Sequence, residues 1–207
     1  RFSDHKKIME GDFEDIKFYN QHFVVETKKT TIKNNYNSYY SLYDFYDNSG
    51  SKINNIAIVE VPTYHSFGKD NLLPITDVNG NTYYIQKSGG KAPINVEDYQ
   101  KIGSFSYGLA PVKHKNNNLY GYINTKGKLV IPCIYRDANY FMGGTALVTT
   151  KKGKHVLINL KNEIVFELPG YVYSKTESPD SEDAEYTMHD NNRNSTTYNH
   201  EGKKISK

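Results

Sequence analysis

The residue types that most often carry catalysis are scattered along this chain without the spacing of a metal site. No His-x-x-x-His or Cys-x-x-Cys pair occurs, so the sequence does not support structural zinc. We expect His114 and His155 to be surface or half-buried strand residues. Cys133 lies between Pro132 and Ile134, where a small buried hydrophobe is a better interpretation than a nucleophile. As the single cysteine, it excludes an internal disulfide and leaves the redox compartment open.

Paired carboxylates are the next candidates, because two of them held about 5–10 Å apart can hydrolyse glycosides. Asp44 and Asp47 flank a segment with strand character, and Glu97 and Asp98 flank an expected turn. Neither pair has the apolar setting that would raise the pKa of one carboxyl group. The sequence therefore offers no acid–base pair.

Two short segments resemble ligand-binding loops only superficially. Residues Asp47–Gly50 lack the alternating ligands and the closing glutamate of a calcium loop. Residues Ser88–Lys91 have the glycines and lysine of a phosphate loop, but a hairpin turn is the better interpretation. We expect no catalytic residue, no metal and no cofactor, and hence a protein that is not an enzyme. A catalytic site assembled across distant repeats is kept as an alternative.

The elements that position these residues follow a repeat. Turn-forming residues separated by 39, 38, 35 and 40 positions stand inside one recurring short phrase: Gly50, Gly89, Gly127, Asn162 and Gly202. Self-similarity at this period indicates one supersecondary unit used several times. The best-defined unit begins at Phe105, and Phe141 opens its successor with the same order of apolar and turn residues.

Alternation of apolar and polar residues predicts three short strands in each unit. Ala110, Val112 and His114 alternate with Pro111 and Lys113, which is typical of a strand with one covered face. A strand is also expected over 120–124, where the missing side chain of Gly121 would let a ring or a backbone segment approach closely. Asn79-Gly80 predicts a further hairpin turn. Almost no helix is expected, at most one turn over 96–100.

Composition narrows the function classes. The chain has 207 residues, 37% hydrophobic, with 19 Tyr, 9 Phe and no Trp, and its formal charge is only +3. Nucleic-acid domains usually have a stronger basic bias, so that partner is unlikely. The basic segments Lys28-Lys29 and Lys151–Lys154 are interpreted as solvated hairpin tips rather than phosphate-binding patches.

The location of the protein stays open from sequence. No apolar run reaches the ~18 residues needed to span a bilayer, so no membrane span is expected. The first residue is Arg1 and no signal-peptide pattern follows it. Both an exported or cell-envelope location and a cytoplasmic one are compatible with these features, and the oligomeric state is unknown.

The phrase Gly-Leu-Ala-x-Val, followed by Tyr-Gly-Tyr-Ile-Asn-x-x-Gly-Lys-x-Val-Ile-Pro-x-x-Tyr, resembles the WG-repeat family of bacterial proteins. It spans Gly108–Tyr135, and 141–165 is similar to it. The family's Trp-Gly is here Tyr120-Gly121, while the other units place Tyr43, Thr82, His155 and Ser195 at the tryptophan position. The resemblance implies β-rich interaction or structural modules with no common catalytic residue.

The fold expected from these features is all-β. Degenerate repeats of about 37 residues would form short antiparallel strands and hairpins stacked as an open twisted array, with a small closed β-propeller as the alternative. We expect a single repeat domain over residues 1–207. Its units would span roughly 18–66, 67–104, 105–140, 141–170 and 171–207.

The expected function is a non-enzymatic binding module, a scaffold that presents an extended β-repeat surface to a protein partner of unknown identity. A bacterial envelope or toxin–immunity context would fit it, and a carbohydrate-binding module that uses exposed tyrosines is the alternative. Tyrosine gives contact area at low entropic cost and stacks on sugar rings. Tyr107 and Tyr140 lie in connecting segments and should be exposed. Tyr39 and Tyr40 lie near several asparagines.

Overall fold

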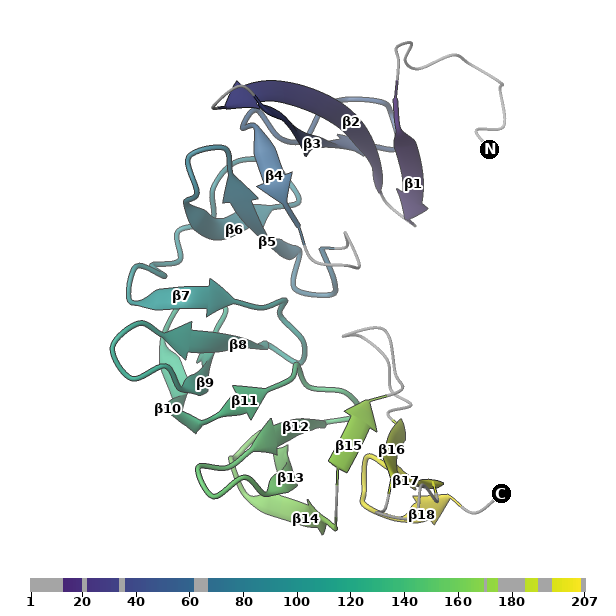
Figure 1. Cartoon of the computed structure of the whole chain (residues 1–207), viewed down its shortest axis with the longest axis vertical. Helices are drawn as coiled ribbons and strands as arrows, with labels where there is room; N and C mark the ends of the chain where they lie inside the picture. Colours follow the sequence, from purple (N-terminus) through teal and green to yellow (C-terminus); the bar gives the residue numbers. More distant parts are fainter. Residues whose placement is uncertain are drawn as a thin grey trace. The chain divides into compact units, whose positions relative to one another are not determined.

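The computed structural model describes residues 13–19, 22–33, 36–61, 67–169, 171–174, 185–189 and 195–205. All regular secondary structure in these residues is β-strand, with antiparallel pairing between neighbouring strands (Figure 1). The chain divides into two compact units, residues 1–66 with 73–92 and residues 67–72 with 93–207. The prediction of an all-β chain built from antiparallel repeats is confirmed.

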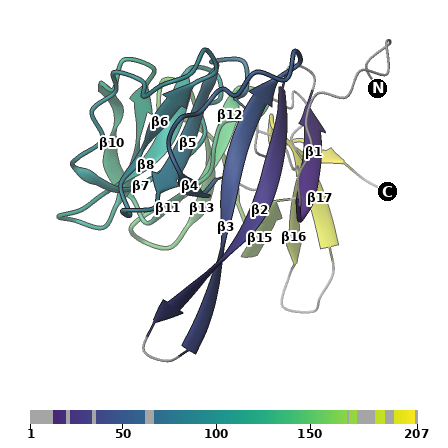
Figure 2. The same ribbon diagram turned by 90° about the horizontal axis from the view of Figure 1, so that it is seen from above.

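The first unit contains one six-stranded sheet in which each strand neighbours the next in sequence. Strands β2 and β3 lie side by side as a long antiparallel pair (Figure 2), and they are in register over their full lengths. The basic pair Lys28-Lys29 lies within β2 opposite Ser41 and Tyr40, so its prediction as a hairpin tip is wrong. The strands are β1 (Asp15–Tyr19), β2 (His22–Lys33), β3 (Tyr36–Asp47), β4 (Ile58–Glu60), β5 (Leu72–Asp77) and β6 (Thr82–Gln86).

The second unit contains three sheets of four strands each, again in sequence order. The first sheet has β7 (Tyr99–Ile102), β8 (Leu109–His114), β9 (Tyr120–Asn124) and β10 (Leu129–Tyr135). The second has β11 (Asp137–Ala138), β12 (Thr145–Thr149), β13 (His155–Asn159) and β14 (Ile164–Leu168). The third has β15 (Tyr171–Ser174), β16 (Glu185–His189), β17 (Ser195–Asn199) and β18 (Lys204–Ile205).

The expectation of three strands in each unit is therefore wrong. The first strand of each sheet of the second unit has four residues or fewer, and β7 and β11 have no alternation of their own. Each of these short strands is held by its pairing with the next strand of the chain. It also lies before the recurring sequence phrase by which the units were recognised, so the phrase does not predict it. The proposed alignment of the best two units is confirmed, because Ala110 pairs with Ile123 just as Ala146 pairs with Ile158.

The central strands of these sheets are covered on both faces, not on one as the alternation predicted. Residues 109–112 of β8 and 121–123 of β9 are all buried. In the second sheet, Ala146 and Val148 join a core with Tyr122 of the first sheet. Leu147 joins a different core with residues of the third sheet. Alternate side chains thus pack against the preceding and the following repeat, as in a sheet buried on both faces.

A side-chain-capped turn accounts for four of the five periodic residues, Gly50, Gly127, Asn162 and Gly202, whereas the turn of Gly89 begins at Gln86. The side-chain oxygen of Asn124 accepts hydrogen bonds from the backbone N–H groups of Lys126 and Lys128, both at 3.0 Å. The N–H of Gly127 donates to the Asn124 carbonyl at 2.8 Å, with a φ of 79° that glycine adopts without strain. Turns of this kind begin at Asp47, Asp77, Asn124, Asn159 and Asn199. The predicted Asn79-Gly80 hairpin is the turn capped by Asp77.

Successive repeats of the second unit are joined by buried hydrogen bonds from tyrosine and serine. The Tyr122 hydroxyl donates to the Asn139 carbonyl at 2.6 Å, and Ser106 donates to the Phe141 carbonyl at 2.6 Å. The prediction for Gly121 is confirmed, because a Cβ there would lie 2.8 Å from the backbone nitrogen of Cys133. Strand β10 therefore crosses β9 closely at this point.

Candidate interaction surface

Apolar side chains are exposed at matching positions of two successive repeats. Leu129 and Val130 follow the capping Asn124 by five and six residues, and both are exposed on β10. Ile164 and Val165 follow Asn159 by the same intervals and are 62% and 42% exposed on β14. Strands β10 and β14 are the outer strands of their sheets, so their free sides are not covered by another strand of the sheet. With Ile134, these residues form what we call the outer-strand stripe.

The local geometry of β10 explains why two consecutive side chains are exposed. Regular alternation would bury one of them. The pairing with β9 shifts between Leu129 and Ile131, and again between Ile131 and Tyr135, so the strand twists out of register. Pro132 also lacks a backbone N–H, which discourages pairing with a further strand. The side chains of β10, rather than its backbone, are what the strand offers to a partner.

Tyr107 is the exposed tyrosine among the sequence-predicted candidates. It stands in a two-residue turn in which the N–H of Ser106 donates to the Leu109 carbonyl at 2.9 Å and the N–H of Leu109 donates back at 3.0 Å. The φ angles of Tyr107 and Gly108 are 53° and 74°, the left-handed region that side chains other than glycine, asparagine and aspartate rarely adopt. The Tyr107 side chain is 42% exposed.

The other candidate tyrosines are placed differently. Tyr140 is half-buried and packs against the core formed by Met142, Leu157 and Tyr186, so the expectation that it is exposed is wrong. Although Tyr140 precedes β12 in a connection, the third repeat covers that connection. The backbones of Tyr39 and Tyr40 lie in β3 opposite Thr30 and Lys29, and their side chains are outside the described residues. Binding by any of the four stays a prediction.

The histidines and the cysteine considered as catalytic candidates are engaged in structural contacts or are partly buried. The His114 ring packs edge-on against Tyr99, with centroids 6.0 Å apart, and its Nδ1 accepts the N–H of Asn116. His155 Nδ1 lies 3.1 Å from the Thr149 hydroxyl. Cys133 is half-buried, and burial raises the pKa of its thiol, which disfavours the reactive thiolate.

Turn hydrogen bonds occupy two of the carboxylates. The Ser49 hydroxyl and the Ser51 N–H lower the pKa of the Asp47 carboxyl group. Burial tends to raise the pKa of Asp77, but hydrogen bonds from the backbone and side chain of Asn81 still hold that pKa below its usual range.

Among the described residues, no group of three or more His, Cys, Asp or Glu side chains could hold a metal ion. A shallow depression in the first unit is lined by Asp15, Lys17, Val24, Glu26 and Tyr43.

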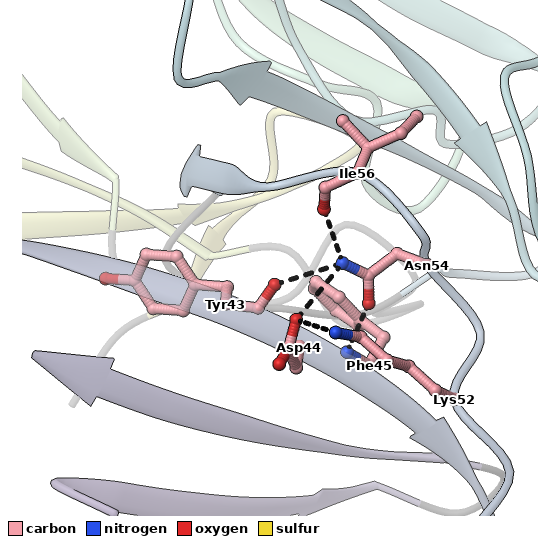
Figure 3. Close-up of polar contacts among 6 residues, drawn as sticks. All are labelled: Tyr43, Asp44, Phe45, Lys52, Asn54 and Ile56. Atoms are coloured by element: carbon pink, nitrogen blue, oxygen red, sulfur yellow. Dashed lines mark hydrogen bonds and ion pairs between the residues drawn. The ribbon is translucent and has the colours of Figure 1, made fainter. Parts of the chain in front are cut away.

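The buried amide of Asn54 is hydrogen-bonded through both its oxygen and its nitrogen. Its oxygen accepts the Phe45 N–H at 2.7 Å, and its nitrogen donates to the Ile56 carbonyl at 2.8 Å. The same nitrogen lies 3.3 Å from the Tyr43 carbonyl and 3.4 Å from Asp44, which pairs with Lys52 (Figure 3). Asn54 therefore fixes the segment after β3 onto that strand and is not free to bind a ligand.

The comparison with protein families decides the nature of the repeats. A family model described as a WG containing repeat matches residues 96–118 and 120–154. These segments are WG repeats. They run from just before β7 through the turn after β12 and include Tyr120-Gly121 at the position of the family's Trp-Gly. No curated protein matches the chain. No helix among the described residues has the length and apolar character needed to cross a bilayer.

Sequence reasoning missed the outer-strand stripe. The signal was present as two consecutive apolar residues that follow each capped turn at a fixed interval, Leu129-Val130 and Ile164-Val165. This pattern alone does not predict exposure, because two consecutive residues of a regular strand point to opposite faces and one of them would be buried. The register shifts of β10 and β14 break the regular alternation and leave both residues of each pair exposed.

Proposed function

We propose that this chain is a non-catalytic binding module that presents the outer strands of its WG repeats to a protein partner. The observation that carries the proposal is the stripe itself, with Leu129 and Val130 matched by Ile164 and Val165 at equal distances from their turns. Isolated exposed hydrophobes are common on protein surfaces, but a recurring exposed set on neighbouring repeats favours an interaction site.

The remaining features support binding rather than catalysis. The described histidines, carboxylates and cysteine considered above are held by turns, aromatic contacts or burial. Stacked repeats give extended surfaces whose contacts can vary from unit to unit. A partner that covers the stripe would remove apolar surface from water, which favours binding by about 25 cal/mol per Å² before the cost of association is subtracted.

The test is affinity capture from a native extract, with the stripe altered on two repeats at once. In the double variant Val130→Lys/Val165→Lys, a charge replaces an exposed valine on each outer strand. Val78→Lys is the control, because Val78 is 51% exposed in a turn of the first unit and is not one of the stripe residues. We expect the wild type and the control to retain one stoichiometric protein and the double variant to lose it. Equal retention by all three would reject the stripe as the binding surface.

Carbohydrate binding is a second candidate, favoured by the exposed ring of Tyr107 in its strained turn. Aromatic rings stack on sugars, and strain held at a surface position is more often found at functional sites. A glycan array probed with the wild type and with Tyr107→Ala tests it. Binding that Tyr107→Ala abolishes would support this function, and an array without a binder would remove it.

A further inference from the structure

Four cations that are distant in sequence lie at one end of the first two sheets of the second unit. Lys115 begins the turn between β8 and β9, and Lys151 and Lys152 lie in the turn between β12 and β13. Arg136 lies between β10 and β11. All four side chains are exposed. We call these residues the basic end.

Backbone and side-chain contacts bring the segments that carry these cations together. The side-chain nitrogen of Asn117 donates to the Cys133 carbonyl at 3.4 Å, which places the β8–β9 turn against the end of β10. The Arg136 N–H donates to the Thr149 carbonyl at 2.7 Å. A Cβ built on Gly153 would lie 3.9 Å from the Arg136 guanidinium, so that side chain extends over the β12–β13 turn. The sequence prediction that Lys151–Lys154 is a solvated hairpin tip is confirmed. That Lys115 and Arg136 lie close to this tip is seen only in the folded structure.

The charges of the basic end are not neutralised by the described part of the chain. Lys154, next to the cluster, is paired with Glu167 at 2.7 Å. None of the four cations of the basic end forms an ion pair with a described carboxylate. Two exposed carboxylates lie nearby, those of Asp98, whose backbone carbonyl accepts the Lys115 N–H, and of Asp137, which accepts the Ala138 N–H. Four cations therefore stand against two anions. The end therefore presents an excess of positive charge.

We propose that the basic end binds an acidic segment of the protein partner, a segment that also carries apolar residues for the outer-strand stripe. This inference rests on the proposed function. Ile134 of the stripe is 40% exposed and stands two residues before Arg136, so apolar and cationic contacts adjoin. Mixed apolar and positive chemistry fits an acidic peptide better than a phosphate backbone. The small formal charge of +3 also disfavours a nucleic acid.

The experiment measures binding of a fluorescein-labelled peptide of glutamates interspersed with leucines, by anisotropy, to the whole chain. The control peptide has glutamine in place of every glutamate. The protein variants are Lys151→Glu/Lys152→Glu in the basic end and Lys126→Glu/Lys128→Glu in the exposed turn before β10, at the opposite end of the first sheet. All variants change charge by the same amount, and melting curves confirm that each is folded.

We expect the glutamate peptide to bind, and its affinity to fall steeply with added salt, since exposed charges are screened over about 10 Å. Lys151→Glu/Lys152→Glu should weaken binding about tenfold and Lys126→Glu/Lys128→Glu less than about threefold, because surface charge pairs act at short range. The glutamine peptide should bind at least about tenfold more weakly.

Three results would overturn the inference: equal binding of both peptides, equal effects of both variants, or tighter binding of duplex RNA or anionic vesicles at the same salt concentration. The proposed function fails separately. If the partner captured through the stripe still binds Lys151→Glu/Lys152→Glu with unchanged affinity, the basic end is rejected while the binding module stands.

Discussion

Tyr107 and Gly143 occupy the same position of two successive turns, with φ angles of 53° and 56°. Both turns are closed by a reciprocal pair of backbone hydrogen bonds, between Ser106 and Leu109 in the first and between Met142 and Thr145 in the second. Glycine meets this geometry without cost, whereas a tyrosine side chain is strained there by about 1 kcal/mol. The first repeat therefore keeps an exposed ring at a position where stability favours a different residue.

Replacing Tyr107 with asparagine should stabilise the protein. Asparagine tolerates the left-handed region and does not add the backbone freedom that glycine gives the unfolded chain. We expect Tyr107→Asn to raise the free energy of unfolding by about 0.5–1 kcal/mol in urea titrations. Gly143→Ala, at the matching position, should lower it by about 1 kcal/mol. A less stable Tyr107→Asn protein would mean that the ring contributes packing that outweighs the strain.

Two buried tyrosines should respond oppositely to loss of their hydroxyl groups. Tyr122 and Tyr186 are both fully buried, and burial raises the pKa of Tyr122 and takes that of Tyr186 to about 12. The Tyr122 hydroxyl donates to the Asn139 carbonyl, while the Tyr186 hydroxyl has no hydrogen-bond partner among the described residues. The Thr145 hydroxyl lies near Tyr186, but it donates its proton to the His200 carbonyl at 3.1 Å and so does not donate to the Tyr186 hydroxyl.

Tyr122→Phe should therefore lower the free energy of unfolding by about 1–2 kcal/mol, because it leaves a buried carbonyl without this donor. Tyr186→Phe should be neutral or stabilise the protein by up to about 1 kcal/mol, because it removes an unsatisfied buried group. Urea unfolding of the two variants side by side measures both changes. A Tyr186→Phe variant as destabilised as Tyr122→Phe would show that the Tyr186 hydroxyl has a partner.

Asn54 should be among the most sensitive polar positions of the first unit. In Asn54→Asp an oxygen replaces the donating nitrogen, and it faces the carbonyl oxygens of Tyr43 and Ile56 and the Asp44 carboxylate. We expect a loss of about 2–4 kcal/mol in unfolding free energy. Asn55→Asp, at the exposed neighbour, makes the same chemical change and should cost less than about 0.5 kcal/mol. Equal effects would contradict the buried network.

Asp47 should contribute to acid sensitivity. Its pKa is lowered in the folded state, so its contribution is complete above the usual aspartate pKa of about 4 and is lost as the pH falls through the lowered value. One carboxylate oxygen accepts the Ser49 N–H, the Ser49 hydroxyl and the Ser51 N–H, and an amide oxygen can do the same.

Asp47→Asn should therefore preserve stability at neutral pH and reduce the loss of stability as the pH falls from about 4 to about 2. Melting temperatures of the variant and the wild type across this range measure the effect. A variant that is already less stable at neutral pH would mean that the turn needs the charge of Asp47 and not only its oxygen.

The sequence was sufficient to predict features that depend on local conformation. The spacing of Gly127 and Asn162 predicted the turns because only residues that accept positive φ suit that position. The close approach at Gly121 followed from the missing side chain. The cap from Asn124 could also have been predicted, since a turn-forming asparagine stands three residues before Gly127.

Features that depend on which segments become neighbours could not be predicted. Strand β11 has two residues and forms only because β12 lies beside it. Tyr140 lies in a connection but is half-buried because the third repeat covers it. The exposure of Val130, and the meeting of Arg136 with the Lys151-Lys152 turn, are likewise set by tertiary packing.

The central claim is that the outer strands β10 and β14 bind a protein partner. Isothermal titration of the captured partner against the wild type, Val130→Lys/Val165→Lys and Val78→Lys tests it most directly. The claim predicts that the double variant binds at least about tenfold more weakly, while Val78→Lys matches the wild type within about twofold. Equal affinities for all three folded proteins would contradict it and place the binding surface elsewhere on the chain.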